Sequence, residues 1–439
     1  MEAARVLVYT GRVGILRWHD LRGRPGPGKW TRRHEPRTAA ALARRGAREE
    51  NRMRFSDPAS DSPRVGSWEE GPRGLPPACY TSPEFYARET ERIFRRDWLF
   101  IGRADEVGRP GDYLSLDLLG EPLVMVRDGA GEIRVLSRIC RHRAMPVVSG
   151  AGHTRTFACP YHSWTYGLDG RLLGAPEMSQ TPGFDLAACR LPSLRTEIWE
   201  GFVFVSFDPH APALGPSLSG LAALCRSYDL ASLRTVRSVP FDMDCGWNWK
   251  LMCENFMEPY HHIGTHRQSL EPLMPARRSV TMDPDGPYAV VHMRYREGDR
   301  STDHDRWGAS TPPVVERLSE EERNRATLIH IFPTGLLTLL PDHVEFYRLF
   351  PDGPSRVRLE KLICVPPGVS ARATFEAEVG QVVNVFLTIR DEDVAICRAV
   401  QEGLGSRFAE PGRLCHLEKA IWQFARYVAA RAGDGSAGV

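Results

Sequence analysis

Two short segments of the chain each bring a cysteine and a histidine close together. Cys140 and His142 form a C-x-H motif, and Cys159 and His162 form a C-x-x-H motif after sixteen intervening residues. Thiolates and imidazoles are metal ligands, and two of each would suit a tetrahedral zinc ion. Zinc fingers, however, group cysteine with cysteine and histidine with histidine, whereas each segment here offers one of each.

This mixed pairing favours a two-iron cluster, in which one iron binds both cysteines and the other binds both histidines. Replacing two thiolates by neutral imidazoles reduces the negative charge and raises the reduction potential. The segment that begins at Cys140 and ends in CPYHSWTY closely resembles the Rieske [2Fe–2S] motif. The resemblance implies that the two cysteines and two histidines are the cluster ligands. Ala144 stands where the family often has glycine, which leaves the ligands unchanged.

A second group of potential ligands lies in the sequence NWKLMCENFMEPYHHIGTH, over residues 248–266. Glu258, His261, His262 and His266 fall within nine residues. On a helix Glu258 and His261 would share one face, whereas His261 and His266 would lie about 140° apart. These two histidines can reach one metal only if the helix is distorted or ends between them. The proline and glycine in this segment allow such an end.

The spacing alone leaves the choice of the first histidine open. His262 and His266 are four residues apart and suit an undistorted helix, so local geometry favours His262. The large subunits of Rieske oxygenases carry Asp or Glu, two residues, His, four residues, and a second His. Glu258, His261 and His266 fit that pattern. The resemblance therefore implies His261 and His266 as iron ligands, Glu258 as an acidic bridge between the two metal centres, and Asn255 as a residue near the iron.

A third ligand is expected from the helix that the apolar pattern predicts near residues 371–407. Asp393 lies inside its apolar stripe, seven residues from an apolar position on either side. A buried carboxylate is costly unless it is paired or bound to metal, so either a metal or a salt bridge to an arginine is expected. Asp391 and Glu392 are expected to be solvent-exposed. The family places its carboxylate ligand in an acidic run on a C-terminal helix, which again implies Asp393.

The elements around these residues indicate an α+β protein. Residues 1–52 are predicted to be a disordered or mis-annotated basic extension, and residues 53–98 the N-terminal helical part of the catalytic domain. An all-β Rieske [2Fe–2S] domain is predicted over residues 99–207 and the catalytic mononuclear iron domain over 208–439. The resemblance covers roughly residues 75–430 and implies a helix-grip, Bet v 1-like catalytic domain with an antiparallel sheet.

Composition limits the partners of this chain. The 439 residues have a formal net charge of +2, but residues 1–54 carry +9 and the remainder −7. A mildly acidic body argues against nucleic acid or an anionic membrane surface as the main partner. No apolar run approaches the roughly 20 residues of a membrane span. Ten scattered cysteines in a long chain favour a reducing compartment, so a cytoplasmic location is expected.

The two groups of ligands would serve one reaction, because one can carry electrons and the other can activate O₂ on Fe(II). The resemblance implies the oxygenase component of a Rieske non-haem iron oxygenase. Its electrons would come from NAD(P)H through a separate reductase, with or without a ferredoxin, since no flavin or nicotinamide fingerprint is present. A homotrimer is expected, with or without a β subunit.

The expected substrate is a small organic molecule that is mono- or dioxygenated, and an aromatic ring compound is favoured. The first alternative is monooxygenation or demethylation of a quaternary ammonium compound of the choline or betaine type. An alternative of another class is a Rieske electron-transfer protein without oxygenase activity.

Overall fold

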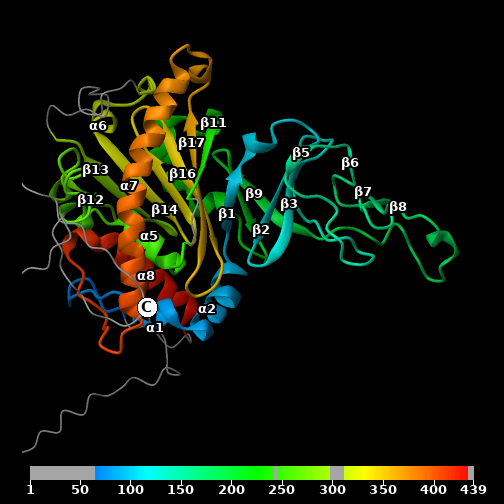
Figure 1. Cartoon of the computed structure of the whole chain (residues 1–439), viewed down its shortest axis with the longest axis horizontal. Coiled ribbons are helices and arrows are strands. Elements are labelled where there is room, and N and C mark those ends of the chain that lie inside the picture. The colour runs from blue at the N-terminus through cyan, green and yellow to red at the C-terminus, as the bar shows by residue number, and fades with distance from the viewer. Residues whose placement is uncertain (1–64, 242–244, 297–310, 434–439) are drawn as a thin grey trace, which may run out of the picture. The chain divides into compact units, whose positions relative to one another are not determined.

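The computed structural model describes residues 65–241, 245–296 and 311–433 (Figure 1). The extension predicted over residues 1–52 lies outside these residues. Within them, the predicted α+β fold is confirmed: the strands around the Rieske motif form an all-β part, which we call the Rieske part, and a separate antiparallel sheet with helices forms what we call the catalytic part. Among the described residues, no helix combines the length and apolar composition that a membrane span requires.

The Rieske part is built from two antiparallel sheets. The larger has the strand order β1-β10-β9-β4-β3-β2-β5 and the smaller the order β6-β7-β8. Both cysteines of the Rieske motif follow a strand end: Cys140 comes three residues after β4 ends at Ser137, and Cys159 comes directly after β6 ends at Ala158. The strands are β1 (Leu99–Arg103), β2 (Asp112–Leu118), β3 (Glu121–Arg127), β4 (Ile133–Ser137), β5 (Ala151–His153), β6 (Thr156–Ala158), β7 (Thr165–Gly167), β8 (Leu172–Gly174), β9 (Ser193–Trp199) and β10 (Phe202–Ser206).

The catalytic part is a seven-stranded antiparallel sheet of order β11-β17-β16-β15-β14-β13-β12. The long helix α7 runs along this sheet with α5 and α8 nearby (Figure 1). The strands are β11 (Arg234–Pro240), β12 (Val280–Thr281), β13 (Tyr288–Arg294), β14 (Arg325–Ile331), β15 (Gly335–Leu339), β16 (Val344–Pro351) and β17 (Val357–Val365). The helices are α3 (Leu214–Ser217), α4 (Ser219–Cys225), α5 (Trp249–Met257), α6 (Glu320–Arg323), α7 (Phe375–Leu404) and α8 (Lys419–Ala432).

Both faces of this sheet are covered, which explains its nearly unbroken apolar strands. Successive side chains of a strand point to opposite faces. In β16, Phe346 packs on Phe100 of the Rieske part, with ring centroids 5.2 Å apart. The next residue, Tyr347, packs on Phe256 of α5 and Phe386 of α7 at 5.3 and 6.4 Å. The second face therefore forms a helix-covered interior, in which a binding site can be enclosed.

The N-terminal helices α1 (Ala78–Thr81) and α2 (Pro83–Glu89) dock against this catalytic part. Lys250 of α5 forms an ion pair of 2.6 Å with Glu89 of α2, and both side chains are completely buried. The indole of Trp249 donates a second hydrogen bond to Glu89 at 3.2 Å. Because a charge without a partner is costly in an apolar interior, this pair fixes α2 on α5.

The sequence predicts a helix over roughly residues 250–265, but the helix in the structure is shorter, because α5 ends at Met257. Pro259 restricts the residue before it to extended backbone, and Glu258 has φ −117° and ψ 123°. A single 3₁₀ turn, Tyr260–Ile263, follows. The helix therefore ends before His261, as a shared metal site for His261 and His266 requires.

Candidate active site

The two Cys–His segments are tight loops of the same construction. In the first loop the backbone N–H of Ala144 donates to the carbonyl of Cys140 at 3.1 Å, and in the second Ser163 donates to Cys159 at 2.9 Å. Ala144 and Ser163 both have left-handed backbone, with φ values of 57° and 60°. Such backbone costs a non-glycine residue roughly 1–2 kcal/mol. Ala144 thus keeps the loop geometry that a glycine would adopt without strain.

In both loops the cysteine is buried and the histidine is exposed. Cys140 and Cys159 are buried, at 2% and 3% exposure, whereas His142 and His162 are exposed. The two imidazole rings lie side by side, with centroids 4.6 Å apart. The hydroxyl of Tyr166 lies 3.3 Å from the sulfur of Cys140. Two inward thiols and two outward imidazoles on adjacent loops fit a Rieske cluster, in which one iron takes two cysteines and the other takes two histidines.

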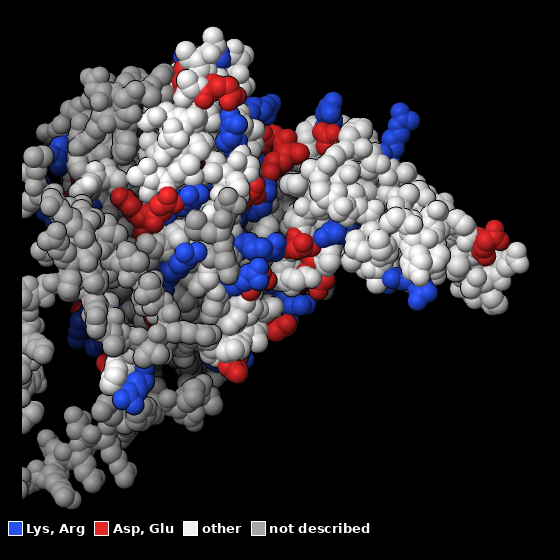
Figure 2. All heavy atoms as spheres, viewed as in Figure 1, with Lys and Arg blue, Asp and Glu red and all other residues white. Residues whose placement is uncertain are grey.

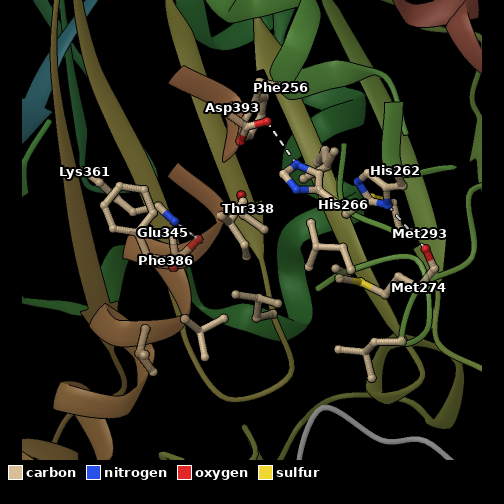
Figure 3. Close-up of a pocket in the computed structure, with 18 of the residues that line it drawn as sticks. Phe256, His262, His266, Met274, Met293, Thr338, Glu345, Lys361, Phe386 and Asp393 are labelled. Carbon is tan, nitrogen blue, oxygen red and sulfur yellow. Dashed lines mark hydrogen bonds and ion pairs between the residues drawn. The ribbon is translucent and has the colours of Figure 1, made fainter. Parts of the chain in front are cut away.

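The mononuclear site brings together three residues that are far apart in the sequence. One ligand atom each of His261, His266 and Asp393 lies within 4.8 Å of the others. Oδ1 of Asp393 lies 2.9 Å from Nε2 of His266 and 3.5 Å from Nε2 of His261. Figure 3 shows the carboxylate of Asp393 facing the ring of His266. Two imidazoles and one carboxylate are the donor set of non-haem Fe(II) sites.

Each of these histidines also contacts a second carboxylate through its other ring nitrogen. Nδ1 of His261 lies 2.7 Å from Glu258, and Nδ1 of His266 lies 2.6 Å from Glu392. Metal-binding histidines commonly donate their second ring N–H to a carboxylate, which fixes the tautomer and ring orientation. Both rings are thereby oriented with Nε2 toward Asp393, so the residues present fit a bound iron.

The expectation that Glu392 is solvent-exposed was wrong. Its side chain is 32% exposed and also accepts a hydrogen bond from the hydroxyl of Ser269 at 2.6 Å. Asp391 does extend into solvent, at 64% exposure, and pairs with Arg390. The helical phase of Glu392 gave no signal of this contact, because its partner lies on a distant loop.

The carboxylates and histidines of the site shift the pKa values of one another. Burial lowers the pKa of His261, but hydrogen bonds to Asp393 and Glu258 outweigh it and raise this pKa to about 10. Burial also opposes ionisation of Asp393, yet the two histidines hold the pKa of its carboxyl far below its usual range. An ionised carboxylate facing two imidazoles is suited to a divalent cation.

The remaining two candidates lie beside this group. Asn255 donates a hydrogen bond from Nδ2 to Asp393 at 3.2 Å. His262 is buried, and its Nδ1 lies 3.4 Å from the carbonyl oxygen of Met274 (Figure 3). Burial lowers the pKa of His262 to about 3. His262 thus lines the same cavity but is not part of the three-residue group.

Comparison with known proteins assigns the chain to a family. Residues 97–190 match the family described as Rieske [2Fe-2S] domain, and residues 231–434 match the ring hydroxylating alpha subunit, catalytic domain. Choline monooxygenase of Beta vulgaris is 32% identical over 361 residues, which cover 80% of this chain and 75% of that protein. The chain is a Rieske oxygenase alpha subunit. Members of this family carry a [2Fe–2S] cluster and a mononuclear iron, and they incorporate oxygen from O₂.

Other relatives of this alpha subunit cover similar lengths. The oxygenase subunit of glycine betaine monooxygenase from Chromohalobacter salexigens is 28% identical over 78% of this chain and 82% of that protein. The quaternary ammonium Rieske monooxygenase CntA, solved with γ-butyrobetaine, matches with a TM-score of 0.68 at 23% identity, covering 82% and 96% of the chains. Naphthalene 1,2-dioxygenase from Rhodococcus sp. matches with a TM-score of 0.65 at 21% identity, covering 81% and 93%.

A cavity of about 200 Å³ opens onto the three-residue group of this alpha subunit (Figure 3). Most of its wall is apolar and aromatic, with Phe256, Tyr347 and Phe386 among the lining residues. One part of the wall is charged, however. Its members are Asp342, His343, Glu345 and Lys361, which we call the polar wall.

The sequence patterns did not single out the polar wall. Glu345 lies on β16 and Lys361 on β17, where Lys361 is the direct cross-strand partner of Tyr347. The two charged residues are therefore diagonal neighbours on one face of the sheet. A charged residue at the inward position of an otherwise apolar strand is the signal that could have identified each of them.

Proposed function

We propose that this alpha subunit oxidises a carbon of a small quaternary ammonium compound, with insertion of one oxygen atom. One observation carries the proposal: the cavity beside the His261–His266–Asp393 group combines aromatic rings with buried charges. Aromatic faces attract a quaternary ammonium group, and such a compound with a second polar group could also use the polar wall, from which a neutral aromatic ring would gain nothing. Choline and glycine betaine monooxygenases among the relatives support this assignment over aromatic ring hydroxylation.

We propose His261, His266 and Asp393 as the iron ligands, and Cys140, His142, Cys159 and His162 as the cluster ligands. Iron bound by the first set would supply the site at which O₂ is activated, one oxygen entering a C–H bond and the other leaving as water after uptake of two electrons and two protons. The chain orients the imidazoles through Glu258 and Glu392. The apolar wall excludes water from the substrate carbon.

The substrate proposal is tested by product analysis with a surrogate reductase. The holoenzyme is supplied with NADH, O₂ and either choline, glycine betaine or γ-butyrobetaine, in parallel with benzoate and naphthalene. Oxygenated or demethylated ammonium products, formed in step with NADH consumption, are expected. Turnover of the aromatic compounds alone would contradict the proposal and favour ring hydroxylation instead.

We propose that Glu258 couples the two metal centres. It accepts hydrogen bonds from the backbone N–H and Nδ1 of His261, and its side chain is 12% exposed. Glu258→Ala is expected to slow cluster oxidation in a single turnover about 10- to 100-fold. Stopped-flow absorbance of the reduced cluster, mixed with substrate and O₂, measures this rate. Glu402→Ala, at an exposed acid of α7, is the control, and an unchanged rate in Glu258→Ala would refute the coupling role.

The family resemblance implies that such coupling crosses between copies of the chain in a head-to-tail trimer, so we propose that assembly here. We further propose that a separate NAD(P)H-dependent reductase, with or without a ferredoxin, delivers the electrons near the cluster. Three exposed arginines lie close to the cluster ligands in the sequence: Arg141 and Arg143 flank His142, and Arg155 lies four residues before Cys159. Figure 2 shows scattered basic side chains on the face formed by the Rieske strands.

An acidic electron donor would dock through these arginines. Arg141→Glu with Arg143→Glu is expected to raise the KM for such a donor about tenfold at low salt, and less at high salt because exposed charges are screened. Reductase-coupled NADH oxidation at two salt concentrations measures the effect. Arg317→Glu, at an exposed arginine of the catalytic part, is the matched control. An unchanged KM in the double variant would exclude docking at these arginines.

A further inference from the structure

The charged side chains of the polar wall pair with one another. Glu345 and Lys361 form an ion pair of 2.6 Å, and Asp342 and His343 form one of 2.7 Å. All four side chains are more than nine-tenths buried. Each carboxylate of this wall therefore already has a cation. A substrate whose only charge is an ammonium group would find no unpaired carboxylate there.

One ring nitrogen of His343 has no hydrogen bond within the described part of the chain, although it faces a carboxylate at ion-pair distance. Its Nδ1 faces Asp342, while its Nε2 forms no hydrogen bond with any described residue, although Oε1 of Glu345 lies 3.5 Å away. Burial lowers the pKa of His343, but the charges of Asp342 and Glu345 outweigh it and raise this pKa to about 9. Both ring nitrogens therefore carry protons at neutral pH. A buried N–H group without a partner is unfavourable, so a ligand oxygen placed there would be held firmly.

Lys361 presents the second cation of the wall. Its ammonium lies 4.0 Å from the ring centre of Phe386, so the face of that ring is already occupied by the protein's own charge (Figure 3). Phe386 and Asp393 are seven residues apart on α7, which corresponds to about 10 Å along the helix axis. A small molecule can therefore extend from the His261–His266–Asp393 group to the polar wall.

We propose that the substrate is a zwitterion, with a trimethylammonium group at one end and a carboxylate at the other. This inference rests on the function proposed above. The substrate carboxylate accepts a hydrogen bond from Nε2 of His343 and faces the ammonium of Lys361. The carbon to be oxidised then lies at the end formed by the proposed iron ligands. The trimethylammonium group contacts the rings that Lys361 leaves free, Phe256 among them.

Two matched pairs of compounds test the proposal. Glycine betaine and choline differ only in a carboxylate against a hydroxymethyl group, and so do γ-butyrobetaine and 4-trimethylammoniobutanol. Anaerobic titration calorimetry of the holoenzyme measures binding without turnover. We expect each carboxylate to bind about tenfold more tightly than its alcohol, or better, because hydrogen bonds to charged groups are among the stronger ones.

Two variants test whether the polar wall causes the tighter binding of the carboxylate compounds. His343→Gln removes one cation, and Lys361→Met with Glu345→Gln removes a whole ion pair, so that neither charge is left unpaired. In both, the preference for the carboxylate should fall to less than about threefold. His416→Gln, at an exposed histidine of the catalytic part, should keep the full preference. Iron content and the midpoint of thermal unfolding identify variants that have not folded.

The outcomes separate this inference from the function it rests on. If the alcohols bind as tightly as the carboxylates, the zwitterion proposal is wrong and the quaternary ammonium function stands. If folded variants still bind the carboxylates more tightly than the alcohols, His343 and Lys361 do not bind the substrate carboxylate. If no trimethylammonium compound binds and benzoate does, both proposals are wrong.

Discussion

Replacing Asp393 by alanine should remove the mononuclear iron and lower oxygenase activity more than about 100-fold, while the Rieske cluster stays intact. Asp393 is the only carboxylate in the group that one ion could reach among the described residues. Without it, two imidazoles remain, and a two-ligand site holds Fe(II) weakly. Iron and sulfide analysis should therefore find the iron and sulfide of the [2Fe–2S] cluster but not the additional iron.

The same helix supplies the control for this experiment. Asp391→Ala removes an exposed carboxylate two residues away, whose partner is Arg390, and should leave iron content and activity near those of the unaltered protein. The electron paramagnetic resonance signal of the reduced cluster should be the same in both variants. Full iron content in Asp393→Ala would exclude this residue as a ligand.

Replacing Lys250 by methionine should lower the free energy of unfolding by about 3–5 kcal/mol. The substitution leaves the carboxylate of Glu89 in a site without any exposed surface. The indole of Trp249 would then be its remaining hydrogen-bond donor among the described residues. Urea unfolding, followed by tryptophan fluorescence, measures the change, and its midpoint should fall without loss of the cluster at low urea concentration.

Two further variants separate charge burial from loss of packing. Lys250→Met combined with Glu89→Gln removes both charges and should recover most of the lost stability, because no unpaired ion remains. Lys419→Met makes the same change in a pair with Asp283 at 2.5 Å, in which the carboxylate is 82% exposed, and should cost less than about 1 kcal/mol. Equal losses at positions 250 and 419 would show that burial of the pair is unimportant.

Much of the fold could be predicted because its signals are local. Apolar residues over 287–294 and 356–365 predict strands, which the structure forms as β13 and β17, and the helix predicted near residues 371–407 corresponds to α7. The residues over 327–350 also predict strand structure, and the structure divides this stretch into β14, β15 and β16, because two turns interrupt it. The apolar pattern of this helix predicts that Val400 is buried, but its side chain is 43% exposed, so the buried stripe ends before it.

The site residues that local sequence patterns determine could also be predicted, whereas those that depend on distant contacts could not. The Cys–His loops follow from spacing within 25 residues, and Asp393 follows from its helical phase. Spacing on a regular helix favoured His262, and only the end of α5 at Met257 allows His261 to approach Asp393. The contacts of Glu392 and of the polar wall depend on strand pairing and loop packing, which no short motif encodes.

The helix α7 carries both ends of the cavity on one rigid element, with Phe386 under the polar wall and Asp393 at the proposed iron site. One residue inserted between them would rotate Asp393 by about 100° and carry it away from the histidines. We therefore expect relatives with other substrates to differ in the side chains of residues 382–393, and hardly ever in the length of that segment.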